Sequence, residues 1–254
     1  RTSAGDSKPN TACGCRLPAS NCSPGCCAIA GLSGNGMGTT PAASRPKTGT
    51  YHRLMARFND RLMTDYEAWI ASRKQELFSD ISGRVIEIGP GTGNNFPHLP
   101  AGIEWLGIEP NPFMHAALRG KARAADIEAQ LHTGGAGMLP EADNSTDYVI
   151  STLVFCSVPD LPQILAEIHR VLKPGGRLLF LEHVAAARGT RLRLLQNLLR
   201  PAWQIIGDGC CINRDTAAAI HAAGFSTVHL EEFRVPRPPA PAWVSPHIIG
   251  RATK

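Results

Sequence analysis

The sequence predicts an α/β protein built around a seven-stranded, mostly parallel sheet with an antiparallel hairpin at one edge. Three observations carry this prediction. Short apolar strands alternate with helical patterns from residue 84 onward, an order that produces a parallel sheet with helices on both faces. The first strand runs directly into a glycine-rich turn. The last two strands are separated by a proline-rich turn at 237–241 and not by a helix, which favours an antiparallel pair.

The first predicted helix spans Tyr51–Phe78, as one helix or two, because apolar residues recur there at three- to four-residue spacing. Arg84–Ile88 is the first strand, an apolar run that ends in glycines. Trp105–Glu109 is the second, and two prolines just beyond it mark the start of a helix. The third strand, Glu128–His132, is a weaker apolar run.

The fourth strand, Tyr148–Phe155, is strongly apolar and leads into a helix at Leu161–Leu172. Lys173-Pro174-Gly175-Gly176 then predicts a helix stop followed by a turn, before a fifth strand at Arg177–Val184. Two further helices and two strands complete the domain, at 191–206, 214–223, Thr227–Val235 and His247–Ala252.

The chain of 254 residues is expected to fall into three parts. Residues 1–50 are rich in Gly, Ser, Thr and Pro, and they predict a disordered, targeting-like tail. Residues 51–82 predict an amphipathic helical segment, and residues 83–254 a single domain with one hydrophobic core.

Five of the 8 cysteines lie in the tail: Cys13, Cys15, Cys22, Cys26 and Cys27. A zinc site there is the alternative to a disordered tail, but the tail has no C-x-x-C pair and no histidine precedes His52. The remaining cysteines, Cys156, Cys210 and Cys211, are too few for a disulfide framework, so the body is expected to fold in a reducing compartment. Buried packing is the expected role of Cys156 and Cys210.

Most of the net charge of +5 also belongs to the tail, and the rest of the chain is close to balanced. Nucleic-acid binding needs a clustered basic face, so we expect no nucleic-acid partner. No apolar stretch approaches the about 18–20 residues of a transmembrane helix. A small molecule is the expected partner. A peripheral membrane contact stays open, as do the oligomeric state and a cytoplasmic, organellar or membrane-surface location.

The most informative stretch is the turn after the first strand, Glu87-Ile88-Gly89-Pro90-Gly91-Thr92-Gly93. In an open parallel sheet, ligands bind at the carboxyl ends of the strands, near the point where strand order reverses. Glycines there let the backbone turn tightly and approach a ligand without a Cβ in the way. A dinucleotide site needs G-x-G-x-x-G, but position 94 is Asn, which argues against an NAD-dependent oxidoreductase.

The spacing fits instead E-x-G-x-G-x-G, the nucleoside-binding turn of class I methyltransferases. In such a turn Gly89, Gly91 and Gly93 bind the cofactor, and Glu87 helps to position the ammonium group of its amino-acid tail. Glu109 ends the second strand about 20 residues after Gly89, the position from which a carboxylate accepts hydrogen bonds from ribose hydroxyls. The predicted cofactor is S-adenosyl-L-methionine.

The resemblance to a known family is broader than this turn. Ala142-Asp143-Asn144-Ser145-Thr146-Asp147 and Val171-Leu172-Lys173-Pro174-Gly175-Gly176 look like the "type 11" group of class I methyltransferases, which includes quinone-biosynthesis enzymes. The resemblance implies a Rossmann-like methyltransferase fold.

A narrower resemblance covers most of residues 66–254 and points to the methyltransferase-like alkyl-thiol S-methyltransferases. Its motifs are Glu76-Leu77-Phe78-Ser79, Asn95-Phe96, Pro110-Asn111-Pro112, Cys156-Ser157-Val158, Glu182-His183-Val184-Ala185-Ala186, Pro201-Ala202-Trp203, Asp208-Gly209-Cys210 and Pro246-His247-Ile248. Animal members are associated with endoplasmic reticulum and lipid droplets. The resemblance implies methyl transfer to a small thiol, giving a thioether.

Three features depart from the family pattern. The amino-terminal hydrophobic anchor of the animal members is missing from this sequence, which puts membrane residence in doubt. Many relatives carry an acid near the adenine, just after strand three, where Gly135, Ala136 and Gly137 supply none. Pro90 stands inside the glycine turn, where cysteine is more usual. We expect weaker adenine recognition without loss of the cofactor.

A sulfonium methyl group is already activated, so no metal is expected at the site. The protein must hold the nucleophile in line with the methyl carbon, and a thiol must reach its thiolate form. His183 and Asp208 are the candidate catalytic residues, as a base or acceptor contact. Thr152 and Leu153 end the fourth strand, where the methyl-donor edge is expected. His247 is expected to be structural.

The helix at 191–206 gathers its apolar side chains on one face: Leu192, Leu195, Leu198, Leu199, Ala202 and Ile206. Core packing is the simplest interpretation. A lid over a lipophilic substrate and a basic interfacial helix on anionic lipid are the alternatives, and the lid is our hypothesis.

The leading functional prediction is an S-methyltransferase for small apolar thiols. A carbon or oxygen methyltransferase acting on a quinone or another lipophilic metabolite is the alternative within the class. A cofactor-binding module without catalysis is the alternative outside it, because acids are missing after strand three.

Overall fold

The computed structural model describes residues 49–254, so the predicted tail lies almost entirely outside the described residues. The helices are α1 (Thr50–Leu77), α2 (His115–Ala124), α3 (Leu161–Val171), α4 (Arg191–Ile206) and α5 (Thr216–His221), with 3-10 turns η1 (Phe96–His98) and η2 (Ala242–Val244). The strands are β1 (Arg84–Ile88), β2 (Glu104–Ile108), β3 (Ala129–His132), β4 (Thr146–Thr152), β5 (Leu172–His183), β6 (Thr227–Arg234) and β7 (Pro246–Thr253).

The seven strands form one sheet in the order β3-β2-β1-β4-β5-β7-β6. Strands β1 to β5 are parallel, and β7 runs antiparallel to both β5 and β6. Both the mostly parallel sheet and the antiparallel edge pair are therefore confirmed. Strand order reverses between β1 and β4, and this switch point is where such sheets bind ligands.

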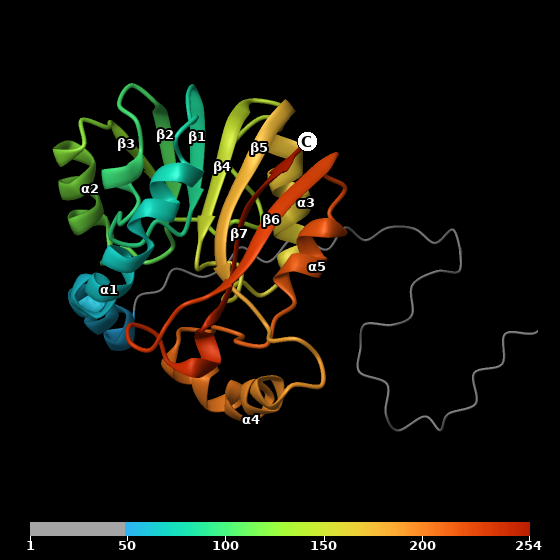
Figure 1. The fold of residues 1–254 in the computed structure, drawn as a ribbon. Coiled ribbons are helices and arrows are strands. Elements are labelled where there is room, and N and C mark those ends of the chain that lie inside the picture. The colour runs from blue at the N-terminus through green and yellow to red at the C-terminus, as the bar shows by residue number, and fades with distance from the viewer. Residues whose placement is uncertain (1–48) are drawn as a thin grey trace, which may run out of the picture. The chain divides into compact units, whose positions relative to one another are not determined.

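Helices cover both faces of the sheet (Figure 1). Helices α1 and α2 bury residues such as Ile70 and Leu118 on one face, and α3 and α5 bury residues such as Leu165 and Ile220 on the other. Neighbouring strand residues alternate between these two cores, as Val149 and Ile150 of β4 do. The central strands are apolar throughout because both of their faces are covered.

The predicted end of β4 at Phe155 is wrong, because the strand stops at Thr152. Leu153 has a positive φ of 58°, which turns the chain away from the sheet. The buried Glu182 carboxylate holds this turn, accepting hydrogen bonds from Val154 N and Phe155 N at 3.1 Å each. Apolar composition continues past the turn and therefore does not mark the strand end.

The predicted turn before β5 is also different in the structure. Strand β5 begins at Leu172, directly after α3, so Lys173 to Gly176 belong to its irregular start. The pairing of β4 with β5 shifts register between Thr146 and Tyr148, which accommodates these residues. A bulged strand and a turn share the same glycine and proline signals, so the sequence could not separate them.

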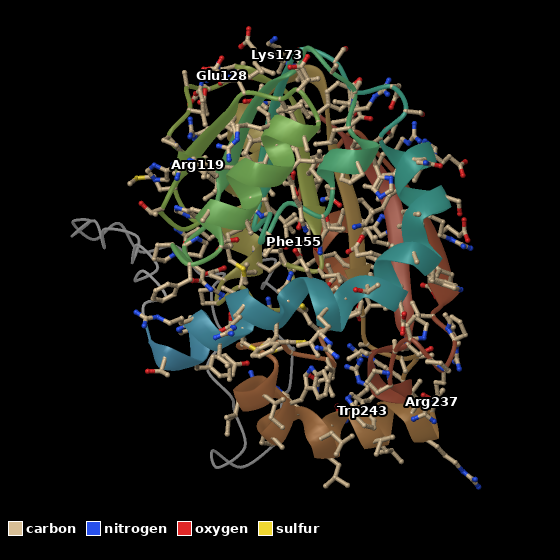
Figure 2. All side chains as sticks on the ribbon, turned by 90° about the vertical axis from the view of Figure 1, so that its left-hand side faces the viewer. Arg119, Glu128, Phe155, Lys173, Arg237 and Trp243 are labelled. Carbon is tan, nitrogen blue, oxygen red and sulfur yellow. The ribbon has the colours of Figure 1, made fainter. Side chains whose placement is uncertain are left out.

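Helix α4 has the predicted bounds but not the predicted packing. Gln196 is its one buried side chain, whereas five large apolar residues are exposed: Leu194, Leu195, Leu198, Ile205 and Ile206. The helix lies at one end of the described domain, beside η2, which carries Trp243 (Figure 2). The ring centroids of Trp203 and Trp243 are 5.7 Å apart. Core packing of this face is therefore wrong.

Among residues 49–254, the structure contains no helix that is both long and apolar enough to span a membrane.

Candidate functional site

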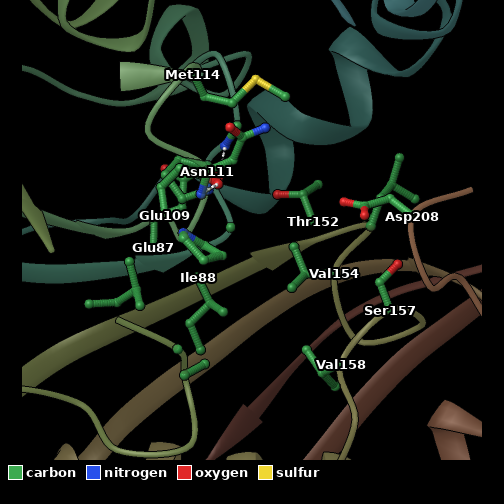
Figure 3. A pocket seen from close by; sticks show the side chains of 18 of the residues that line it. Glu87, Ile88, Glu109, Asn111, Met114, Thr152, Val154, Ser157, Val158 and Asp208 are labelled. Atoms are coloured by element: carbon green, nitrogen blue, oxygen red, sulfur yellow. Dashed lines mark hydrogen bonds between the residues drawn. The ribbon is translucent and has the colours of Figure 1, made fainter. Parts of the chain in front are cut away.

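A cavity of about 540 Å³ opens at the carboxyl ends of β1, β2 and β4, at the switch point of the sheet. This volume lies in the range of small-molecule and cofactor sites. Figure 3 shows Glu109 and Asn111 toward one side of the cavity and Asp208 and Ser157 toward the other. The two sides differ in chemistry, as the residues below show.

The glycine turn forms part of the cavity wall. Gly89 and Gly91 line it with φ angles of +61° and +58°, a conformation that glycine adopts without strain. Gly89 N donates to Ile108 O at 2.9 Å, and Gly91 N donates to Glu109 Oε2 at 2.9 Å. The turn is thus anchored to the end of β2 and presents its backbone to the cavity.

Gly93, the third predicted cofactor residue of the turn, does not line the cavity. It has a φ of +86°, and a Cβ at this position would lie 2.6 and 2.7 Å from ring atoms of Phe96. The structure therefore gives this glycine a packing role: it leaves room for the buried Phe96 ring. Spacing alone does not distinguish a glycine that approaches a ligand from one that accommodates a side chain.

Glu109 lies just beyond β2 and lines the cavity while being only 6% exposed. Its Oε1 accepts from Asn111 N at 2.8 Å, and its Oε2 accepts from Gly91 N as described above. These two backbone donors fix the plane of the carboxylate. Because a carboxylate can accept about four hydrogen bonds, the group is also able to accept from a ligand hydroxyl.

Glu87 lies at the base of the cavity and is buried. Burial raises its pKa to about 7, although Asn95 Nδ2 at 2.8 Å and Trp105 Nε1 at 3.0 Å donate to its two oxygens. The other amide atom of Asn95, Oδ1, is buried without a partner in the described part of the chain, and Asn95 also lines the cavity. A cationic group bound here would ionise Glu87 and satisfy Asn95 Oδ1.

Helix α1 supplies a wall that the sequence did not predict. Five of its residues line the cavity: Met55, Asn59, Met63, Glu67 and Lys74. Lys74 is 1% exposed, and its Nζ lies 2.5 Å from Glu67 Oε2. The one available signal was a lysine on the apolar stripe between Ile70 and Leu77, where a buried cation needs a partner.

A polar network fixes α1 against the glycine turn. Thr92 Oγ1 donates to Asp60 Oδ1, and Lys121 Nζ lies 2.8 Å from the same oxygen. Lys121 Nζ also donates to Asn94 Oδ1 at 2.6 Å. The wall formed by α1 is therefore held by two other segments, the glycine turn and α2.

Gly135 and Ala136 line the cavity together with Met114, Met138 and Gln163. Backbone and apolar side chains make up this part of the wall, and Gln163 Nε2 donates to Gly137 O at 3.2 Å. Asp160, at the start of α3, also lines the cavity, but its Oδ1 caps the helix by accepting from Gln163 N at 3.0 Å. No acid follows β3 directly, as the sequence indicated.

Thr152 and Leu153 line the cavity at the end of β4, next to Val154 and Ser157. Asp208 faces them from the loop after α4, and its Oδ1 lies within hydrogen-bond distance of His52 Nε2, at 3.2 Å. His52 belongs to α1, and no sequence pattern indicated it. This side of the cavity combines apolar side chains such as Val154 and Val158 with the hydroxyl groups of Thr152 and Ser157, and Asp208 lies at its edge (Figure 3).

His183, the other predicted catalytic residue, is buried and does not line the cavity. Its Nε2 lies 2.9 Å from Cys210 Sγ, so the imidazole lies behind the cavity wall, next to sulfur. His247 is buried in β7, with Nδ1 3.0 Å from Ser245 O, and burial lowers its pKa to about 4. A structural role for His247, as expected, fits these contacts.

Comparison with known proteins gives a consistent picture. A methyltransferase-domain family model matches residues 86–180. Thiol S-methyltransferase TMT1B of Rattus norvegicus is 41% identical over 196 residues, which cover 72% of this chain and 79% of the relative. Thiol S-methyltransferase TMT1A of Homo sapiens is 39% identical over 207 residues, 76% of this chain and 83% of the relative.

The fold also has solved counterparts. An S-adenosylmethionine-dependent methyltransferase from Thermotoga maritima matches with a TM-score of 0.55 and 21% identity, over 81% of this chain and 100% of the other. At that identity the likeness concerns the fold alone.

Proposed function

Because this chain belongs to the thiol S-methyltransferase family of S-adenosylmethionine-dependent methyltransferases, we propose that it methylates a small lipophilic alkyl thiol. The observation that carries the proposal is the two-sided cavity. Carboxylates and glycine backbone line the side suited to a nucleoside amino acid, and an apolar wall ending at Asp208 lines the side left for the acceptor.

The residues of the cavity fit S-adenosylmethionine. Glu109 would accept hydrogen bonds from the ribose hydroxyls. Glu87 and Asn95 Oδ1, which is buried without a partner in the described residues, would accept from the ammonium group. Lys74 would attract the carboxylate of the same amino-acid tail, since it lines the cavity and is buried beside Glu67. A zwitterionic tail thus meets charges of the matching signs.

When bound, the cofactor supplies a sulfonium methyl group that a thiolate sulfur can attack, which forms a thioether and leaves S-adenosylhomocysteine. The protein must hold the acceptor in line and accept its proton. Asp208 is the carboxylate on the acceptor side, and His52 beside it can take up the proton that Asp208 receives. We therefore assign proton acceptance to the Asp208–His52 pair, and not to His183.

An Asp208→Asn protein is expected to methylate an alkyl thiol with a kcat/KM about 100-fold lower at pH 7, the lower end of the about 10²–10⁴-fold that general bases contribute to the rate. The deficit should shrink above about pH 9, where a free thiol of pKa near 8.5 ionises without help. The measurement is a pH profile of transfer from labelled S-adenosylmethionine to an alkyl thiol.

Asp126→Asn is the matched control, because Asp126 and Asp208 share a left-handed backbone, with φ of 55° and 52°. Only Asp208 lines the cavity. Equal losses in both variants, or a loss independent of pH, would remove Asp208 from the proton path.

The choice of acceptor tests the alternative functions. Transfer to a demethylated quinone or a phenol but not to thiols would favour the carbon or oxygen methyltransferase. Cofactor binding with no turnover on any acceptor would indicate a binding module.

We also propose that the outer face of α4 contacts membranes peripherally. Leu194, Leu198 and Ile205 are 65%, 76% and 79% exposed. No α4 side chain lines the cavity, so the lid hypothesis gains no support.

The apolar face of α4 continues onto the start of α1. Tyr51 Oη donates to Ile206 O at 2.5 Å, which joins the two helices, and Leu54 of α1 is exposed nearby in the sequence. Exposed arginines flank these apolar residues: Arg53, Arg57, Arg61, Arg188, Arg191 and Arg200. An apolar face with surrounding arginines suits an anionic lipid surface.

Vesicles that contain anionic lipid are expected to co-sediment with the protein, and a Leu194→Ser/Leu198→Ser variant should bind them at least about 10-fold more weakly, since each buried leucine contributes about 1.5–3 kcal/mol. Methyl transfer to a water-soluble thiol should be unchanged in this variant. Binding that is equal for the variant, or equal on purely zwitterionic vesicles, would contradict the proposal.

A further inference from the structure

Two cysteines and a histidine converge behind the acceptor side of the cavity. Cys156 follows β4, His183 ends β5, and Cys210 lies in the loop after α4, and all three are buried. Their Sγ and imidazole nitrogen atoms all lie within 4.8 Å of one another. Three segments far apart in the sequence thus bring two soft sulfurs and one imidazole to a single point.

The donor set is characteristic of one class of ligand. Zn²⁺ binds thiolate sulfur at about 2.3 Å and imidazole nitrogen at about 2.0–2.1 Å, and in tetrahedral geometry such ligand atoms lie about 3.5–3.8 Å apart. The present 2.9 Å between His183 Nε2 and Cys210 Sγ would open by about 0.5–1 Å around an ion of this size. Side-chain rotation suffices for a change of that order.

The surroundings of the three side chains also favour a cation. Trp203 Nε1 donates to Cys210 Sγ at 3.2 Å, a contact that stabilises a metal-bound thiolate. His183 Nδ1 is buried and has no hydrogen-bond partner among the described residues, whereas its Nε2 lies against Cys210 Sγ at 2.9 Å.

We propose that Cys156, His183 and Cys210 bind one thiophilic divalent cation, with Zn²⁺ as the fitting ion. Three protein ligands leave a fourth tetrahedral position for an exogenous ligand, as in other sites with two cysteines and one histidine. The ion would join the ends of β4 and β5 to the loop that carries Asp208. It would thereby fix the acceptor side of the cavity without taking part in cofactor binding.

The test is the metal content of the full chain, purified under reducing conditions and supplied with Zn²⁺, followed by spectroscopy with Co²⁺ in its place. We expect one Zn²⁺ per chain that resists dialysis, and tetrahedral ligand-field and thiolate-to-cobalt charge-transfer bands with Co²⁺. Cys156→Ser and Cys210→Ser should lose the charge-transfer intensity and at least about 10-fold in Zn²⁺ affinity.

Two controls make the result specific. Cys211→Ser should keep the ion, because Cys211 is also buried but its sulfur accepts from Gln204 Nε2 outside the cluster. Replacing the five cysteines of the amino-terminal tail by serine should likewise leave one bound ion. The proposal would be overturned if the variant without the tail cysteines lost the ion, or if Cys156→Ser kept it. It would also be overturned if Cys211→Ser lost the ion equally, or if no form of the protein bound metal. Circular dichroism of each variant shows whether a loss of metal binding is due to misfolding. If it is, Cys210→His retests the site, because histidine keeps a metal-ligating side chain at this position.

Discussion

A Glu109→Gln protein is expected to bind S-adenosylhomocysteine about 100-fold more weakly than the unaltered protein, a loss of about 2.7 kcal/mol. Hydrogen bonds to a charged group contribute about 1.5–3 kcal/mol, and the carboxylate is placed to accept from both ribose hydroxyls. The amide keeps the size of the side chain but replaces one accepting oxygen with a donor. That donor would also oppose the N–H of Gly91 or of Asn111, to which the carboxylate is now bonded.

Isothermal titration calorimetry with the demethylated product measures this affinity without turnover. Glu104→Gln is the control, because Glu104 starts the same strand but is exposed, in a surface ion pair with Arg84. It should bind the product as the unaltered protein does. If Glu109→Gln also bound with unchanged affinity while remaining folded, the ribose would have to be held elsewhere, and the orientation proposed for the cofactor would be wrong.

Sequence reasoning predicted the parts of the candidate site that depend on local chemistry. The glycine turn comes directly after the first strand in the sequence, and Glu109 comes directly after the second. A glycine or a carboxylate at the end of a parallel strand predicts where the backbone meets a ligand. The structure places Glu87, Gly89, Gly91 and Glu109 around one cavity. These positions were predictable because each residue is placed by the strand that precedes it. Parallel pairing of the strands is then enough to bring the residues to the same edge of the sheet.

The contributions of distant segments were not predictable in this way. Lys74 and His52 reach the site only because a long helix packs across the carboxyl ends of the strands. Asp208 was proposed from its motif, but its partner His52 is separated from it by 156 residues. The periodicity of a single sequence does not specify which face of α1 contacts which loop. These residues are brought to the site by tertiary packing, which the sequence pattern does not reveal.

Helix α4 and His183 show a second limit. An apolar stripe on a helix predicts burial, yet the stripe of α4 is left exposed because the sheet is already covered by the four other helices of the described chain. His183 was expected to reach the cavity because it ends β5. The strand instead directs it toward the sulfur atoms of Cys156 and Cys210. A strand end predicts the edge of the sheet but not which side of a loop the side chain faces.

The difference between a ligand-binding glycine and a packing glycine can be measured at Gly93. A Gly93→Ala protein is expected to lose about 2–5 kcal/mol of unfolding free energy, from a left-handed backbone that costs alanine about 1–2 kcal/mol and from overpacking at about 1–3 kcal/mol. For a domain of this size, the melting temperature should fall by about 4–20 °C. The Phe96 ring cannot easily yield, because it is 2% exposed and packs 4.8 Å from the Trp105 ring.

Gly102→Ala isolates the backbone contribution, because Gly102 has a similar φ of +78° but a Cβ added there would meet no atom within 4 Å. It should lose only about 1–2 kcal/mol. The excess loss in Gly93→Ala then measures the displacement of Phe96, and it should be accompanied by weaker binding of S-adenosylhomocysteine. The reason is that Phe96 supports Trp105, whose Nε1 donates to Glu87 at 3.0 Å beneath the cavity. Equal melting temperatures for the two variants would show that the ring relaxes freely, and the packing role of Gly93 would then be wrong.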